Sequence, residues 1–293
     1  VLQRYVYRPK YKSSYKYKMI SVVIPSLGGN LCETIDSLNR GTLVPDEIIV
    51  CLPNNKHTIY NLENYKNVVV IYSGKYSQVY QRICGFKQSH GDQVLQLDDD
   101  VFVSPSCLSL LVESMDSLDE NASISPCWYD TNNNRPLHQE KKKTLIMMIY
   151  YWVLNGKNSY IPGQVALAGA NFGVNPIDML KKHINVDWQP GGCILHRRKN
   201  LILENYYPYK GKAYYEDLMH SFLLRESNVL LVVNIDAICM THINPRIQLI
   251  NEIVRDIRAR FYFVRLANLS VTRMFTFYVI YIARTILFNL NKK

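Results

Sequence analysis

Four short apolar runs, spaced along the first hundred residues, constrain the fold of this chain more than any other feature. They are ISVVIP (20–25), DEIIVCL (46–52), NVVVIYS (67–73) and QVLQLD (93–98). Segments of helical length lie between them at 30–40 and 75–89, and another follows at 106–118. Runs rich in Val and Ile that alternate with helices are typical of a parallel sheet buried on both faces. We therefore predict an α/β fold with a mostly parallel, Rossmann-like sheet flanked by helices.

Three consecutive carboxylates, Asp98 to Asp100, directly follow the fourth run. Such sheets bind ligands at the carboxyl ends of their strands, where Pro25 and Ser26 also fall. Adjacent carboxylates repel one another unless a cation lies among them, and their oxygens suit Mg²⁺ or Mn²⁺ better than zinc. A metal held by one or two carboxylates completes its shell with water and phosphates, which favours a nucleoside diphosphate ligand. A solvated turn that caps the next helix is the alternative.

A second acidic pair, Glu216 and Asp217, lies in the first turn of the amphipathic segment YYEDLMHSFLLRESN (214–228). The field at a helix N-terminus favours an ionised carboxylate, which a general base requires. Acids in a first helical turn also occur for stability alone. The role of His242, which follows the apolar run at 229–234, also has two interpretations, because a lone histidine is more often a packed residue than a metal ligand.

The net charge of +10 is concentrated at the two ends of the chain. Residues 1–18 carry six Lys or Arg and no acid, and residues 245–293 carry nine against two acids, which leaves −3 for residues 19–244. A nucleic-acid-binding protein should show a basic face in its folded body, so we expect no nucleic-acid partner. Seven scattered cysteines without a C-x-x-C pair argue against a disulfide framework and a zinc cluster, and favour a reducing cytosol.

Taken in order, these stretches resemble family 2 glycosyltransferases of the GT-A fold, of the bacterial surface-polysaccharide type. The resemblance covers roughly residues 19–244. It rests on SVVIPS, on the stretch that leads into LDDDVFVSP, on VDWQPGGCILHRR, on the YYEDL helix and on a downstream histidine. It implies a metal-dependent, inverting transfer of a sugar from a nucleotide-sugar donor to a hydroxyl of a saccharide acceptor. A lipid-linked acceptor in surface-polysaccharide or glycolipid synthesis is the expected setting.

The resemblance also implies roles for single positions. Asp98, Asp100 and His242 would hold Mn²⁺ or Mg²⁺. Asp217 would be the catalytic base that deprotonates the acceptor, and Glu216 would orient that base or the acceptor. Gly191 and Gly192 would lie in the loop beside the donor sugar, where the absence of side chains would allow close approach. The donor-binding positions implied are Pro25, Ser26, Glu33, Gln81, Arg82, Asp98, Asp99, Gly191 and Gly192.

One position departs from the family pattern. Many members carry an acid just after the second strand that reads the nucleobase, whereas this chain has Cys51 and Leu52 within VCLPNN. The nucleobase of the donor is therefore not predicted. Asn54 or Asn55 would be the available hydrogen-bonding groups.

The C-terminal region, 245–293, combines an amphipathic helix with a short apolar segment. Ten apolar or weakly polar residues, MFTFYVIYIA (274–283), precede Arg284. A spanning helix needs about 20 such residues, so we predict interfacial helices on an anionic membrane, with attraction added by the basic arm, 1–18. For the C-terminal amphipathic helix, the alternative is that it packs on the catalytic domain, 19–244. For the N-terminal arm, the alternative is a disordered, solubilising segment. The apolar stripe of the first helix is Ile250, Val254, Ile257, Phe261 and Val264.

These features predict a peripheral or monotopic protein on the cytoplasmic face of the cell membrane. No apolar segment with a small-residue cleavage site opens the sequence, so a secretory signal is not expected. A nucleotidyltransferase on a similar sheet is the main enzymatic alternative. It would require a Gly-rich phosphate loop near residue 26, where the chain offers only Gly28 and Gly29.

Overall fold

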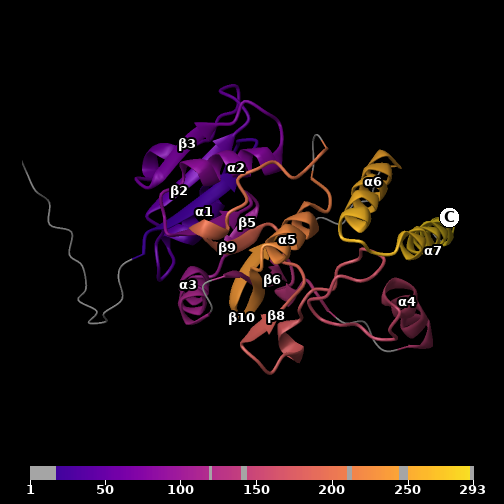
Figure 1. Ribbon diagram of the computed structural model, residues 1–293. Coiled ribbons are helices and arrows are strands. Elements are labelled where there is room, and N and C mark those ends of the chain that lie inside the picture. The colour runs from indigo at the N-terminus through magenta and orange to yellow at the C-terminus, as the bar shows by residue number, and fades with distance from the viewer. Residues whose placement is uncertain (1–17, 119–120, 140–143, 210–212, 244–249, 291–293) are drawn as a thin grey trace, which may run out of the picture.

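The computed structural model describes residues 18–118, 121–139, 144–209, 213–243 and 250–290, with the side chains of Glu63, Ile250, Asn251 and residues 283–290 excepted. Most of the basic arm predicted at 1–18, the start of the region predicted at 245–293 and its last three residues lie outside this description. The described chain folds into a mixed sheet with helices on both faces (Figure 1).

In chain order the elements are β1 (Ile20–Pro25), α1 (Cys32–Asn39), β2 (Glu47–Leu52), β3 (Val68–Tyr72), α2 (Gln78–Gln88), β4 (Gln93–Leu97), β5 (Val101–Val103), α3 (Cys107–Ser117), β6 (Ala122–Asp130), β7 (Arg135–Pro136), α4 (Leu145–Asn155), β8 (His183–Asn185), β9 (Cys193–Arg197), α5 (Glu216–Glu226), β10 (Leu230–Thr241), α6 (Ile250–Leu266) and α7 (Val271–Leu290).

The strand order of the sheet is β3-β2-β1-β4-β9-β6-β10-β5. Strands β1 to β4 are parallel, and β6 pairs in parallel with β10. Strand β9 lies antiparallel between β4 and β6, and β5 runs antiparallel to β10. The predicted α/β fold with a mostly parallel sheet and flanking helices is confirmed. The antiparallel β9 joins the two parallel parts and brings the loop before it to the end of β4.

Both faces of the parallel part are buried, which explains its continuous apolar runs. On β1, Val22 and Ile24 pack into the cluster that contains α1 and α3, whereas Val23 points to the other face and packs against Phe86 of α2. Helix α2 also contacts α5, because Ile83 and Leu218 share a second cluster. The packing therefore places α2 and α5 next to each other on one side of the sheet.

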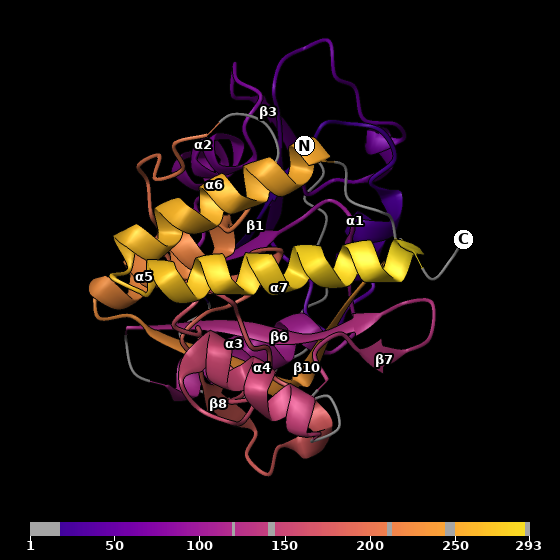
Figure 2. The same ribbon diagram turned by 90° about the vertical axis from the view of Figure 1, so that its right-hand side faces the viewer.

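Helices α6 and α7 run side by side on one side of the molecule, and α4 lies beside α7 (Figure 2). Phe263 and Val264 of α6 are buried, whereas Val254 and Phe261 are exposed. The apolar stripe expected on this helix is thus only partly turned toward the protein: Val264 of the stripe is buried, and so is Phe263, which lies outside the stripe. None of the helices in the described ranges is long and apolar enough to cross a membrane.

Candidate active site

The carboxyl ends of β1 and β4 lie side by side and carry the first polar cluster of the site. Ser26 follows β1, and its hydroxyl donates a hydrogen bond to Asp99 Oδ2 at 2.6 Å. Thr34 of α1 donates to the Asp99 carbonyl at 2.9 Å, and the Val101 amide donates to the Asp98 carbonyl at 3.3 Å. The turn after β4 is therefore fixed by both its side chains and its backbone.

Helix α2 presents three polar residues to the strand ends and to the turn after β4, at positions i, i+3 and i+4. Gln78 Nε2 donates to Asp98 Oδ1 at 3.1 Å, and Arg82 Nη2 donates to the same oxygen at 3.0 Å. Gln81 Nε2 donates to the carbonyls of Ser26 and Cys51, at 2.8 and 2.7 Å, and so joins the ends of β1 and β2. Gln81 thus acts on the strand ends, and Gln78 and Arg82 act on the acidic turn.

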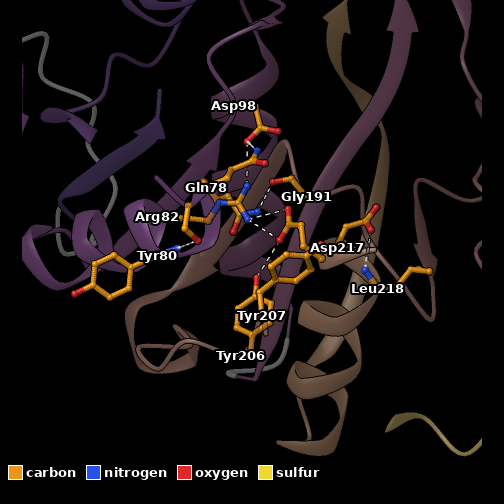
Figure 3. Close-up of polar contacts among 12 residues, drawn as sticks. Gln78, Tyr80, Arg82, Asp98, Gly191, Tyr206, Tyr207, Asp217 and Leu218 are labelled. Atoms are coloured by element: carbon orange, nitrogen blue, oxygen red, sulfur yellow. Dashed lines mark hydrogen bonds and ion pairs between the residues drawn. The ribbon is translucent and has the colours of Figure 1, made fainter. Parts of the chain in front are cut away.

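Arg82 connects the two acidic segments, which are far apart in the sequence. Its side chain is 1% exposed, and Nη1 donates to both carboxylate oxygens of Glu216, at 3.0 and 2.9 Å. The hydroxyl of Tyr206 donates to the same carboxylate at 3.0 Å. Burial opposes the guanidinium charge, but the carboxylates of Glu216 and Asp98 raise the pKa of Arg82 above its ordinary value. Figure 3 shows Arg82 reaching Asp98 from α2, with Asp217 turned away from the guanidinium.

Asp217 is held differently from Glu216, although both lie in the first turn of α5. Its Oδ1 accepts a hydrogen bond from the Leu218 amide at 2.9 Å. Burial raises the pKa of Asp217 to about 7, and the neighbouring Glu216 carboxylate adds to the rise. A carboxylate with this pKa exchanges its proton near neutral pH, as a general base must.

Two pockets open between these elements and together form one cleft. Their volumes are about 410 Å³ and 460 Å³, and they share Gln78 and Asp99. The predicted site residues that line them are Pro25, Ser26, Gln81, Asp98, Asp99, Asp100, Gly191, Gly192, Glu216 and Asp217. The structure thus brings together the residues of four separate motifs.

Three predicted residues do not line either pocket. Arg82 lies buried behind the cleft, where it acts through Asp98 and Glu216. Glu33 is exposed on the first turn of α1. His242 follows Thr241, which pairs with Val101, but its ring packs edge-on against Phe102, with centroids 5.2 Å apart. The donor role of Glu33 and the metal role of His242 stay predictions.

The close packing of the loop before β9 leaves no room for a side chain at Gly191 or Gly192. A Cβ atom at Gly191 would lie 2.6 Å from Glu216 Oε1, and one at Gly192 would lie 2.7 Å from the ring of Trp128. Gln96 Nε2 donates to the Gly191 carbonyl and holds the loop against β4. The glycines therefore permit close packing of this loop against both acidic segments, and they also line the larger pocket.

The position at which the family carries a base-reading acid is filled by buried Cys51 and Leu52. Asn54 Oδ1 accepts from the Lys56 amide and bonds to His57 Nδ1, each at 3.0 Å. The other ring nitrogen of His57 bonds to the Tyr76 hydroxyl at 3.0 Å, and Tyr76 lines the smaller pocket.

Two residues that line the cleft, Tyr76 and Gln78, are not among those predicted from the sequence. Gln78 was detectable in principle, because it lies one helical turn before Arg82 and so shares its face of α2.

The expected metal would bind among the carboxylates of the cleft. Among the described residues there is no group of three or more His, Cys, Asp or Glu side chains arranged to hold a metal ion. Mg²⁺ and Mn²⁺ do not require one, because one or two carboxylates together with substrate phosphates suffice. Asp98 and Asp100 both line the larger pocket, and Asp98 Oδ2 lies at its Gly192 side. The oxygen-only donor set therefore fits a hard divalent cation.

The sequence of the chain matches the model of a known protein family over more than half of its length. The model for glycosyl transferase family 2 matches residues 21–201. The chain belongs to this family. The resemblance inferred from the sequence motifs is thereby confirmed, and the acidic turn after β4 lies inside the matched region.

Solved structures show the same fold. The crystal structure of GalNAc-T7 with UDP, GalNAc and Mn²⁺ has a TM-score of 0.55 and 14% identity to this family 2 chain, over 78% of this chain and 44% of that chain. The crystal structure of S. aureus TarS 1-349 has a TM-score of 0.50 and 16% identity, over 87% of this chain and 68% of that chain. The chain thus spans less than half of the GalNAc-T7 chain. No curated protein sequence matches it significantly.

Proposed function

We propose that this protein transfers a sugar from a nucleotide-sugar donor to a hydroxyl group of a saccharide acceptor, with inversion at the anomeric carbon. One observation carries the proposal. A single cleft is lined by Asp98 to Asp100 on one wall and by Asp217 on the other, and buried Arg82 links the two walls. A diphosphate needs a charged subsite and an attacking hydroxyl needs a base, and this cleft offers both.

In the proposed reaction, the Asp217 carboxylate takes the proton of the acceptor hydroxyl. The acceptor oxygen forms a bond to the anomeric carbon while the bond from that carbon to the diphosphate oxygen breaks, and the nucleoside diphosphate leaves. One displacement inverts the anomeric centre. Both oxygens of Glu216 accept hydrogen bonds from Arg82, so Glu216 positions the start of α5 and leaves proton transfer to Asp217.

Asp98 and Asp100 would hold Mn²⁺ or Mg²⁺ against the donor diphosphate. When bound, the cation neutralises the charge that develops on the departing diphosphate. The UDP and Mn²⁺ in the GalNAc-T7 structure make these the first ligands to test. The chain's own contribution is to keep the acidic turn fixed through Gln78, Arg82 and Ser26.

The nucleotidyltransferase alternative is disfavoured by the loop after β1. Gly28 and Gly29 have positive φ angles of 90° and 100°, and a Cβ at Gly28 would lie 2.6 Å from the Thr58 carbonyl oxygen. The Gly29 amide donates to that same carbonyl at 2.8 Å. These glycines therefore serve the packing of two loops, not a phosphate-binding loop.

A thermal-shift screen of nucleotide sugars, with and without Mn²⁺ or Mg²⁺, tests the donor site. We expect a nucleotide sugar to raise the melting temperature of the protein only with metal, and Asp100→Asn to remove that rise. Asp98 is left unchanged in this test, because its bonds to Arg82 and Gln78 would be lost with it. Glu113→Gln, an exposed acid on α3, is the matched control. A rise that survives Asp100→Asn, or no rise with any nucleotide sugar, would contradict the site.

We also propose that the acceptor is lipid-linked and that α4 and α7 rest on the anionic cytoplasmic face of the membrane. The two helices are in contact, and both expose apolar side chains. Residues 245–293 carry a charge of +7, which complements anionic lipid. The large apolar residues exposed on the described parts of the two helices are Leu145, Ile146, Met148, Ile149, Trp152, Phe275, Val279, Ile280 and Ile282.

Vesicle sedimentation tests the membrane proposal. Ile149→Glu combined with Val279→Glu should reduce binding to vesicles that contain phosphatidylglycerol by at least about tenfold, because each change places a charge in the apolar interface. The control is Leu180→Glu, since Leu180 is fully exposed and lies outside both helices. Equal binding by the double variant and the wild type would contradict the proposal.

A further inference from the structure

The residue before the two carboxylates of α5 has an unusual backbone conformation. Tyr215 is the N-cap of the helix, with φ 59° and ψ 15°, in the left-handed region that bulky residues rarely adopt. Its side chain makes no capping hydrogen bond to the helix. A strained conformation of this kind persists only where the surroundings determine it. Something outside α5 must therefore hold Tyr215.

Arg260 of α6 makes that contact. It is 7% exposed, its Nε donates a hydrogen bond to the Tyr215 hydroxyl, and its guanidinium lies 4.8 Å from the centre of the Tyr215 ring. The rings of Phe277 and Tyr278 from α7 lie on the same guanidinium, at 4.3 and 5.0 Å. Cation–π contacts that exclude water are stronger than exposed ones. Three aromatic rings thus enclose the buried guanidinium of Arg260 next to the first residue of α5.

Neighbouring contacts fix the same segment from other directions. The Tyr214 amide donates to the Tyr207 hydroxyl at 2.8 Å. Phe263, one turn after Arg260, packs with Leu218 and Met219 of α5. Helix α6 therefore contacts α5 at two places. Arg260 contacts the N-cap residue of α5, and Phe263 packs against the first turn of α5.

We infer that Arg260 is a positioning residue for the transfer reaction: by holding Tyr215 in its left-handed conformation, it fixes where Glu216 and Asp217 enter the cleft. A glycine would adopt this backbone conformation without strain, but it would offer no ring or hydroxyl to Arg260. The choice of tyrosine is explained by its partner on α6. This inference rests on the proposed function, since it assigns Asp217 its role there.

The test compares Arg260→Met, Arg260→Lys and Arg265→Met in the whole 293-residue chain. Arg265 is exposed on the same helix and serves as the control. We expect Arg260→Met to lower kcat by at least about tenfold, with the Kd of the nucleotide sugar within about threefold of wild type. Arg260→Lys should recover part of the loss, because a lysine keeps a cation near the rings. Equal kcat in Arg260→Met and wild type, or no recovery by lysine, would overturn the inference.

Hydrogen exchange of the amides in residues 213–219 gives a readout that needs no activity. Exchange in this peptide should be faster in Arg260→Met than in Arg265→Met, while exchange in β1 and β4 stays unchanged. If the wild type transfers no sugar, the proposed function fails, and this measurement still decides whether Arg260 holds the segment. Unchanged exchange in residues 213–219 would refute the positioning role. Faster exchange throughout the protein would also refute it, because Arg260 would then stabilise the whole fold and not this segment in particular.

Discussion

The two acidic segments of the cleft differ in how their carboxylates are held. Asp98, after β4, and Glu216, at the start of α5, both accept hydrogen bonds from Arg82. Asp217, the next residue along α5, accepts one from a backbone amide of its own helix, and burial raises its pKa to about 7. In the proposed reaction this difference separates two tasks. Carboxylates that share a buried cation fix the geometry of the cleft, and the neighbouring carboxylate stays available for proton transfer.

The largest effect should come from removing the shared cation. Arg82→Met leaves the Glu216 carboxylate without its buried partner, which should lower the free energy of unfolding by about 3 to 5 kcal/mol. Arg40→Met is the control, because Arg40 pairs with Asp36 at 2.8 Å on the surface and such pairs contribute about 0.5 kcal/mol. Urea unfolding of both variants measures the contrast. Equal unfolding midpoints would contradict the role assigned to Arg82.

The next effect is the pH dependence of the transfer rate. A base must be deprotonated to act, so kcat/KM for the acceptor should rise as pH increases through the pKa of Asp217 in the free protein, which is about 7. Between about pH 6 and pH 8 the deprotonated fraction rises about tenfold, and kcat/KM should follow it. Initial rates at acceptor concentrations below KM measure this. A kcat/KM that is flat over this range, with chemistry rate-limiting, would remove Asp217 from the proton transfer.

The smallest of these effects concerns Gln78, which holds Asp98 from the same helix as Arg82. Gln78→Leu removes one hydrogen bond to Asp98, worth about 1 kcal/mol, and should weaken donor binding about fivefold. Gln88→Leu is the matched control, because Gln88 is exposed at the other end of α2. Calorimetric titration of the donor compares the two. A larger loss in Gln88→Leu than in Gln78→Leu would show that the helix, and not the contact, matters.

The first half of the sheet was predictable because its signals are local. Strands β1 to β4 are short apolar runs, and the structure reproduces each within two residues of its predicted bounds. The sequence pattern did not predict β6 or β9. Strand β6 contains Pro126 and two buried serines, and β9 ends in His196 and Arg197. Both become strands because partners from other parts of the chain lie on each side of them.

The candidate site was predictable as a set of motifs, but not as a network. The motifs identify Asp98 and Asp217, which the structure places in one pocket. The Arg82 contact to Glu216 joins residues 134 positions apart, and no local pattern encodes such a pair. The Tyr215 contact to Arg260 was missed for the same reason. The apolar stripe predicted on α6 does not include Arg260, whereas tertiary packing buries this residue among three aromatic rings.

Single-turnover transfer by Asp217→Asn tests the central claim most directly. Asparagine keeps the shape of the side chain but cannot take a proton, so the rate of transfer from prebound donor should fall by at least about a thousandfold. The Kd of the donor should stay within about threefold of wild type, because Asp98, Asp100 and Arg82 are untouched. Transfer by Asp217→Asn at a rate near that of wild type would contradict the account and move the base elsewhere.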